Sequence, residues 1–82
     1  MNEQDILAKV TSVFRDVFQD GSIVVRKDMT ADDVQNWDSL THIDMIMLIE
    51  EAFGIRVPTR AITTMKNVGD LVGIIDSQVN KQ

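Results

Sequence analysis

The sequence contains no cysteine and no tyrosine, and it has one histidine. Without cysteine the chain can form no disulfide, has no thiolate nucleophile and lacks the cysteine ligands that structural zinc sites use. With one histidine and neither cysteine nor tyrosine, few side chains could exchange a proton near neutral pH. The chain alone is therefore poorly equipped for catalysis, and we expect any reactive group to come from outside it.

Long apolar runs and excess positive charge are also missing. No stretch approaches the roughly 20 apolar residues that cross a bilayer, and the first residues lack the basic and apolar regions of a signal peptide. The formal net charge is −5, which would repel a phosphate backbone. We therefore expect a cytoplasmic protein that neither inserts into a membrane nor binds nucleic acid.

A metal site is not predicted either. Asp28, Asp32 and Asp33 suggest an acidic calcium loop, but such a loop needs glycine at its sixth position and glutamate at its twelfth. Counted from Asp28, these positions hold Asp33 and Ser39. The calcium pattern therefore fails.

What remains is an ordinary globular composition in a short chain. The 82 residues are 44% hydrophobic and 26% charged, which is too apolar for a disordered chain and long enough for one small core. No internal repeat or linker composition appears. We therefore expect one domain over residues 1–82, with Lys81 and Gln82 fraying at its end.

Apolar residues in the first quarter of the chain recur with helical spacing. This spacing predicts one apolar stripe, formed by Ile6, Leu7, Val10, Val13, Phe14, Val17 and Phe18. We expect the helix to end near Gln19, with Gly21 closing it in the left-handed conformation. The apolar run 23–25 has no partner strand and is expected to be a loop fixed to the core, and residues 30–33 are expected to start a capped helical turn.

Three more helices follow. Asp38 and Ser39 are favoured N-cap types, so a second helix should begin there and continue to Phe53, before Gly54. Residues 60–65 are long enough for a short third helix. Asn67 can cap a fourth, whose stripe is Val68, Leu71, Val72, Ile75 and Val79. The predicted fold is all-α, a small four-helix bundle of three longer helices and one short one.

The second helix has apolar residues on two faces. One face is expected to enter the core, and it comprises Met45, Ile46, Ile49, Ala52 and Phe53. The opposite face carries apolar and acidic side chains together, namely Leu40, Ile43, Asp44, Met47, Glu50 and Glu51. Small domains expose scattered apolar residues, and neighbouring helices could cover some of these. Alternatively, this face docks a basic groove with apolar edges on another protein.

Ser39 is the strongest candidate for chemistry, although a serine at a helix start is often only a cap. Its surroundings, Asn36 to Ile43, resemble the attachment motif of the acyl carrier protein family. The segment Glu50 to Pro58 resembles the end of the family's second helix and the following loop, and Asn67 to Val72 resembles the opening of its last helix. With the first helix, the resemblance covers nearly the whole chain.

The resemblance implies that a separate phosphopantetheinyl transferase esterifies Ser39, between Asp38 and Leu40 of the motif, with 4′-phosphopantetheine from coenzyme A. The thiol of that arm then holds acyl groups as thioesters for acyl-loading, acyl-transfer and synthase enzymes. The protein itself would be a monomeric, non-catalytic carrier. A phosphodiester on Ser39 would lie at the positive end of the helix dipole, and we expect free backbone N–H groups there.

The cargo is less well determined by the sequence. The family often shelters an acyl chain between its helices, which makes Ile46, Ile49, Ile62 and Met65 candidates for lining a pocket, although core packing explains them equally well. Thr41 stands where fatty-acid carriers usually have an acid, and Arg56 and Arg60 add positive charge nearby. Fatty-acid, polyketide, aminoacyl or peptidyl, and modified lipid or saccharide cargoes therefore stay open.

A different class of function also stays open. The chain could be an unmodified helical adaptor that docks one protein through the second helix and uses Ser39 only as a cap. Near this helix, we expect His42 to be a hydrogen-bonded residue at the edge of the core and Trp37 to anchor the preceding loop.

Overall fold

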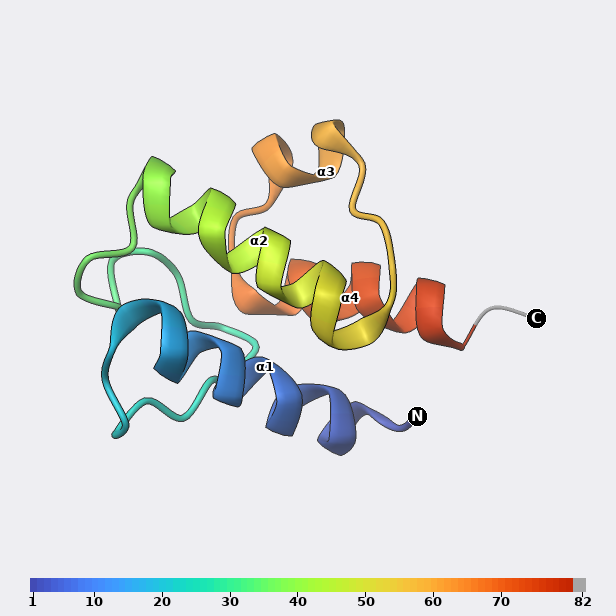
Figure 1. Ribbon diagram of the computed structural model, residues 1–82, viewed down its shortest axis with the longest axis horizontal. Coiled ribbons are helices and arrows are strands. Elements are labelled where there is room, and N and C mark those ends of the chain that lie inside the picture. The colour runs from blue at the N-terminus through green and yellow to red at the C-terminus, as the bar shows by residue number, and fades with distance from the viewer. Residues whose placement is uncertain (81–82) are drawn as a thin grey trace.

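The computed structural model describes residues 1–80, and within them it contains four helices and no strand (Figure 1). These helices are α1 (Glu3–Phe18), α2 (Ser39–Phe53), α3 (Thr59–Thr64) and α4 (Val68–Val79). The prediction of three longer helices and one short helix is confirmed. The expectation for Lys81 and Gln82 lies outside the described residues. In the described part of the chain no helix is long and apolar enough to cross a membrane.

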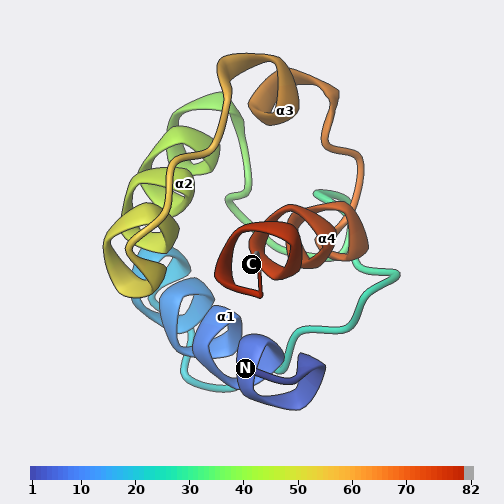
Figure 2. The same ribbon diagram turned by 90° about the vertical axis from the view of Figure 1, so that its right-hand side faces the viewer.

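The three longer helices surround the core, and α3 lies apart from them. α1 runs antiparallel to both α2 and α4, so the start of α2 lies at the opposite end of the molecule from the start of α1 (Figure 1). Viewed from the end, α1, α2 and α4 enclose the interior while α3 lies outside them, on the side where α2 starts (Figure 2). The site at the start of α2 is therefore next to the most peripheral helix.

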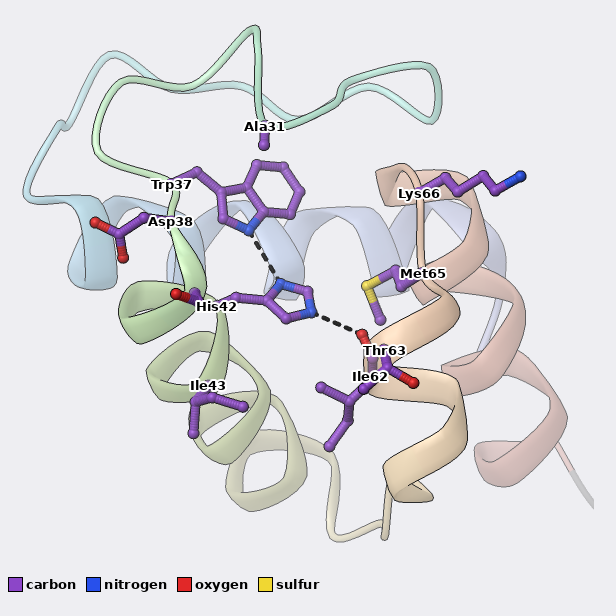
Figure 3. Close-up of a pocket in the computed structure, with 10 residues that line it drawn as sticks. Ala31, Trp37, Asp38, His42, Ile43, Ile62, Thr63, Met65 and Lys66 are labelled. Carbon is purple, nitrogen blue, oxygen red and sulfur yellow. Dashed lines mark hydrogen bonds between the residues drawn. The ribbon is translucent and has the colours of Figure 1, made fainter.

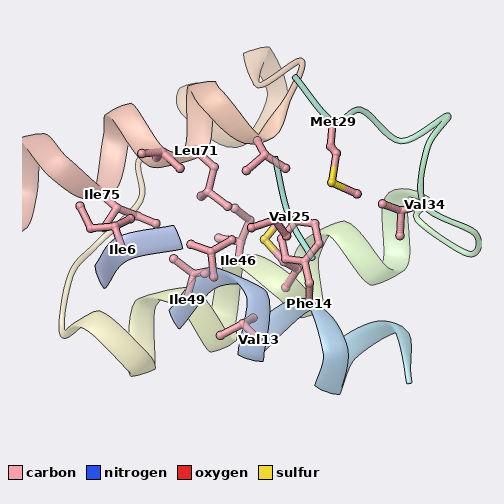
Figure 4. Close-up of a cluster of buried hydrophobic side chains, with 14 of the residues drawn as sticks. Ile6, Val13, Phe14, Val25, Met29, Val34, Ile46, Ile49, Leu71 and Ile75 are labelled. Carbon is pink, nitrogen blue, oxygen red and sulfur yellow. The ribbon is translucent and has the colours of Figure 1, made fainter. Parts of the chain in front are cut away.

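Apolar side chains from these three helices interlock in the core (Figure 4). The largest fully buried ones are Phe14, Ile6, Met45, Ile46, Ile49, Leu71, Ile75, Val10 and Val68. Burying each stabilises the fold by about 1.5 to 3 kcal/mol relative to exposure. Ala52, expected on the core face, is instead exposed. It lies at the edge of the stripe, where its carbonyl accepts a hydrogen bond from Lys9 Nζ at 3.2 Å.

The end of α1 differs from the expected one. Gln19 adopts the left-handed conformation with φ 51°, and its N–H donates to the carbonyl of Arg15. Gly21 does not adopt a positive φ. The prediction that Gly21 closes the helix is therefore wrong, because Gln19 already satisfies the last carbonyl. Asp20 then accepts hydrogen bonds from the Ser22 hydroxyl and amide, which lower the pKa of the Asp20 carboxyl.

The long connection between α1 and α2 is fixed to the core by three apolar side chains. Val25, Met29 and Val34 are buried, so the expectation that the segment 23–25 is a core-fixed loop is confirmed. Residues 30–33 form a turn in which the Thr30 amide donates to Asp33 Oδ2 at 3.0 Å and the Asp33 amide to the Thr30 carbonyl at 2.9 Å. The expected cap is present, but no helix follows it.

This connection also contacts the start of α4. The amides of Val68 and Gly69 donate to the carbonyls of Met29 and Lys27 at 2.9 and 2.7 Å. A Cβ atom on Gly69 would lie 3.0 Å from the Lys27 carbonyl oxygen, whereas one on Gly73 would meet nothing within 4 Å. The close contact between the backbone of the loop at Lys27 and the start of α4 therefore requires glycine at position 69, whereas position 73 has room for a side chain.

This difference predicts opposite effects of two identical substitutions. Gly73→Ala should raise the free energy of unfolding by about 0.5 to 1 kcal/mol, because alanine is the better helix former and has room. Gly69→Ala should lower it by roughly 1 kcal/mol, because the hydrogen-bonded loop cannot move away from the new methyl group. Urea denaturation of both variants measures these changes. Equal stabilisation by both would contradict the close approach at Gly69.

Candidate functional site

The side chain that caps α2 is Asp38, which precedes Ser39. Asp38 Oδ1 accepts hydrogen bonds from the amides of Leu40 and Thr41 at 2.9 and 3.0 Å, and Thr41 Oγ1 accepts one from the Asp38 amide at 2.8 Å. This reciprocal pair is a capping box. Ser39, the first residue of α2, is exposed, and its hydroxyl has no hydrogen-bond partner within residues 1–80. The serine is therefore free of any capping role.

The sequence analysis treated Thr41 only as a missing acid, and the structure gives it a local role. Besides accepting from Asp38, its hydroxyl donates to the Asn36 carbonyl at 2.7 Å, which holds the loop against the helix start. Asn36 itself has a left-handed φ of 72°. The spacing of Asp38 and Thr41 was the signal that could have revealed this, because an N-cap acceptor pairs with the residue three positions later.

The electrostatics of the helix start also differ from expectation. The amides of Leu40 and Thr41 donate to Asp38, so the free backbone N–H groups expected near a phosphate on Ser39 do not include these two. The hydrogen bond from the Thr41 amide lowers the pKa of the Asp38 carboxyl against a smaller opposing effect of desolvation, and the Leu40 amide and the Thr41 hydroxyl lower it further. A negative charge therefore already occupies the positive end of the α2 dipole.

A pocket of about 540 Å³ opens beside Ser39, between α2, α3 and the preceding loop (Figure 3). Its lining is mostly apolar and consists of Ala31, Trp37, Asp38, Ser39, His42, Ile43, Ile62, Thr63, Met65 and Lys66. Pockets for small molecules are typically roughly 300 to 1,000 Å³ and mainly apolar. This one therefore has the size and character to accept an organic group attached at Ser39.

Trp37 and His42 form one wall of this pocket (Figure 3). Trp37 Nε1 donates to His42 Nδ1 at 3.0 Å, and His42 Nε2 lies 3.1 Å from the Ile62 carbonyl oxygen. An indole N–H can only donate, so Nδ1 accepts and Nε2 carries the proton that is donated to Ile62. Trp37 also packs edge-on against Phe14 at 5.3 Å. The expectations for Trp37 as a loop anchor and His42 as a hydrogen-bonded boundary residue are confirmed.

The four candidates for lining an acyl pocket separate into two pairs. Ile62 and Met65 line the pocket beside Ser39. Ile46 and Ile49 are instead 2% and 0% exposed within the core and do not line it. Sequence analysis missed Ile43, Trp37 and His42 as part of this wall. Their closeness to Ser39 in the chain was the available signal.

The outer face of α2 is exposed as expected. Leu40, Ile43 and Met47 are 78%, 47% and 61% exposed, and Leu48, which the sequence analysis did not include, is 38% exposed. Asp44 and Glu51 are exposed, and neither forms an ion pair within residues 1–80.

Glu50 does not belong with this outer face. It is half-buried, and its Oε2 accepts a hydrogen bond from the Val57 amide at 2.8 Å. The carboxylate therefore fastens the loop after α2 to the helix and is not presented to a partner. No group of three or more potential metal ligands comes together in the described part of the chain.

Comparison with known proteins agrees with this geometry. Residues 8–75 match the family model described as the phosphopantetheine attachment site. The chain is 35% identical over 80 residues to an acyl carrier protein of Thermosynechococcus vestitus, covering 96% of this chain and 98% of the relative. It is 33% identical over 79 residues to an acyl carrier protein of Guillardia theta, with 96% and 98% coverage. The chain belongs to the acyl carrier protein family.

A solved structure supports the same assignment. The solution structure of the holo acyl carrier protein from Geobacter metallireducens superimposes with a TM-score of 0.84 at 36% identity, covering 92% of this chain and 86% of the other. The expected family and all-α fold are thus confirmed. As an acyl carrier protein, the chain is a non-catalytic carrier whose cofactor is 4′-phosphopantetheine, and it interacts with synthase and transferase enzymes.

The Asp38 cap predicts a pH-dependent stability difference. Because folding lowers the pKa of Asp38, its contribution is present above the unfolded-state pKa of about 3.9 and is lost as the pH falls through the folded-state value. Asp38→Ala should therefore lower the melting temperature at pH 7, and this difference should shrink below about pH 3.9.

Thermal unfolding followed by circular dichroism from pH 7 to pH 2 measures the difference. Asp38→Asn is the matched control, because it keeps an acceptor oxygen without the charge. A melting-temperature difference between wild type and Asp38→Ala that stays constant down to pH 2 would show that the ionised carboxylate does not stabilise the helix start.

Proposed function

We propose that Ser39 is the residue that receives 4′-phosphopantetheine, and that the protein carries acyl groups on it as thioesters in fatty-acid, polyketide or related specialised biosynthesis. The observation that carries this proposal is the division of roles at the start of α2. Asp38 caps the helix, so the exposed Ser39 hydroxyl has no structural task that the structure describes. An unmodified adaptor using Ser39 as its cap is not supported by this arrangement.

The residues around Ser39 fit such a modification. The Ser39 oxygen would bond to the phosphorus of coenzyme A as the bond to adenosine 3′,5′-bisphosphate breaks, while its proton passes to the transferase. An activating base within the carrier is not needed, which agrees with the scarcity of such groups in the sequence. When bound, the arm supplies the thiol that the chain lacks. A mostly apolar pocket directly beside Ser39 offers room for what is attached.

The outer face of α2 is our proposed docking surface for the transferase and the acyl-transfer enzymes. We define it by Leu40, Ile43, Met47, Asp44 and Glu51, and leave out Glu50 because its carboxylate is engaged by Val57. Leu40 and Ile43 lie within about one turn of Ser39, and Met47 continues the same face along α2. A partner can bury these apolar side chains, while the two free carboxylates favour a partner with basic residues.

Replacing the serine should separate modification from stability. With coenzyme A and a broad-specificity phosphopantetheinyl transferase, the wild-type protein should gain the mass of one phosphopantetheine group and Ser39→Ala should gain none. The variant's free energy of unfolding should change by no more than about 0.5 kcal/mol, because the hydroxyl is exposed and does not cap. Intact-mass spectrometry and urea denaturation provide the two measurements.

Ser12→Ala is the matched control, because Ser12 is exposed on α1 and should leave loading unchanged. Loading of Ser39→Ala would move the attachment site elsewhere. Failure of wild type to gain mass, under conditions that load another acyl carrier protein, would reject the proposal.

Charge reversal tests the docking surface. Asp44→Lys and Glu51→Lys should each lower kcat/KM for loading by roughly threefold to tenfold at low salt, because they replace attraction to a basic partner by repulsion. The effect should diminish at about 0.5 M salt, where charges are screened within a few ångströms. Initial loading rates at several salt concentrations give the comparison.

Asp5→Lys is the control for net charge. It makes the same change in the first turn of α1, at the end of the molecule away from Ser39 (Figure 1). If Asp5→Lys slows loading as much as Asp44→Lys does, the carboxylates of α2 have no special part in the encounter.

A further inference from the structure

One side chain of α2 makes a hydrogen bond to the backbone of α3. α3 is six residues long, has no buried residue and has no side-chain cap at its start. His42 of α2 supplies a hydrogen bond across this gap, from Nε2 to the Ile62 carbonyl of α3 at 3.1 Å. Ala61 and Ile62 of α3 and the following Met65 also pack, partly buried, against the core, and this bond adds a direct link between α2 and α3 beside Ser39.

The His42 ring is also held from its other side. Trp37 donates to Nδ1 at 3.0 Å, and the two rings lie edge to edge in nearly the same plane, with centroids 6.0 Å apart. Trp37 in turn packs against Phe14 and Phe18 of α1, with ring centroids 5.3 and 5.9 Å apart. The imidazole is therefore braced against the core through an aromatic cluster. It cannot turn away from Ile62 without giving up both hydrogen bonds.

The pocket beside Ser39 does not reach the buried side chains of the core. Its wall includes His42, Ile43 and Ile62, but none of the next inward-facing residues of α2, which are fully buried in the core. A group longer than the pocket has two alternatives. It can extend into water, or it can enter the bundle after α3 moves away from α2 and breaks the bond between His42 and Ile62.

Building on the proposed function, we infer that His42 is a specificity-determining residue that restricts the sheltered cargo to short, mainly apolar acyl groups. By holding α3 against α2, it keeps the acyl group in the pocket of about 540 Å³ beside Ser39, which the arm also enters. A short acyl group is covered by Trp37, Ile43 and Met65. The additional carbons of a long chain stay largely exposed to water, because the His42 ring blocks access to the core.

A series of acyl groups of increasing length tests this inference. Acetyl, butyryl, hexanoyl and dodecanoyl coenzyme A are loaded onto the protein by a broad-specificity phosphopantetheinyl transferase, and intact mass confirms each product. The rate of thioester cleavage by hydroxylamine is then compared with that of the matching free acyl-pantetheine. In wild type, butyryl and hexanoyl thioesters should be cleaved at least threefold more slowly than their free counterparts. The dodecanoyl thioester should be cleaved at nearly the free rate.

Variants at position 42 test whether the limit on acyl length depends on the two hydrogen bonds of His42. His42→Leu substitutes an apolar side chain of similar size and removes both hydrogen bonds. In this variant the dodecanoyl thioester should be cleaved at least threefold more slowly than in wild type. His42→Gln can still donate to the Ile62 carbonyl and should restore the wild-type length profile. Gly69→Ala, which loosens the contact between α4 and the loop, controls for general loss of stability and should leave the profile unchanged.

Each outcome decides the matter. The inference is overturned if wild type protects dodecanoyl as well as hexanoyl, if His42→Leu keeps the wild-type profile, or if Gly69→Ala alters the profile as His42→Leu does. If His42→Leu does not fold, the wild-type and His42→Gln profiles still test the limit on length. Absence of any mass gain in wild type would reject the proposed function instead, which keeps the two failures distinguishable.

Discussion

The capping of α2 by Asp38 is the interaction on which the site depends. The first amides of a helix have no partner within the helix, and here the Asp38 carboxylate accepts hydrogen bonds from the amides of Leu40 and Thr41. The neighbouring Ser39 is thereby placed on the first turn of a rigid helix with its hydroxyl unused. The same cap, through Thr41, ties down the loop that carries Trp37. One local hydrogen-bond arrangement thus fixes the helix start, exposes the serine and positions a wall of the pocket.

α2 carries two tasks on opposite faces, and packing keeps them separate. Met45, Ile46 and Ile49 are buried against α1 and α4, so the stability of the bundle does not depend on the outward side chains. Leu40 and Met47 are free to be covered by other proteins, at the modest cost of some exposed apolar surface. Substitutions on the outer face should therefore leave the packing of the core intact.

Periodicity predicted the helices well because each long helix buries one continuous stripe. It failed where a contact made elsewhere in the chain decides the outcome. Ala52 lies at the edge of its stripe and is exposed. From its spacing Glu50 is expected to be a surface acid, but its carboxylate accepts a hydrogen bond from the Val57 amide. Gln19, and not Gly21, adopts the left-handed conformation that ends α1. Ser39, our proposed attachment site, could be identified from its motif, whereas the wall formed by Trp37 and His42 required the fold.

The arrangement of α3 follows from the same distribution of apolar surface. The three longer helices and the connecting loops supply all the buried side chains, which leaves α3 with none and makes it the element whose position costs least to change. The position of such an element has to be set by a contact with the rest of the protein. A single histidine at the edge of the core can do this, because its two nitrogens face opposite ways and join the rigid loop to the loose helix. Stability therefore resides in α1, α2 and α4, and selectivity for cargo resides in how α3 is held.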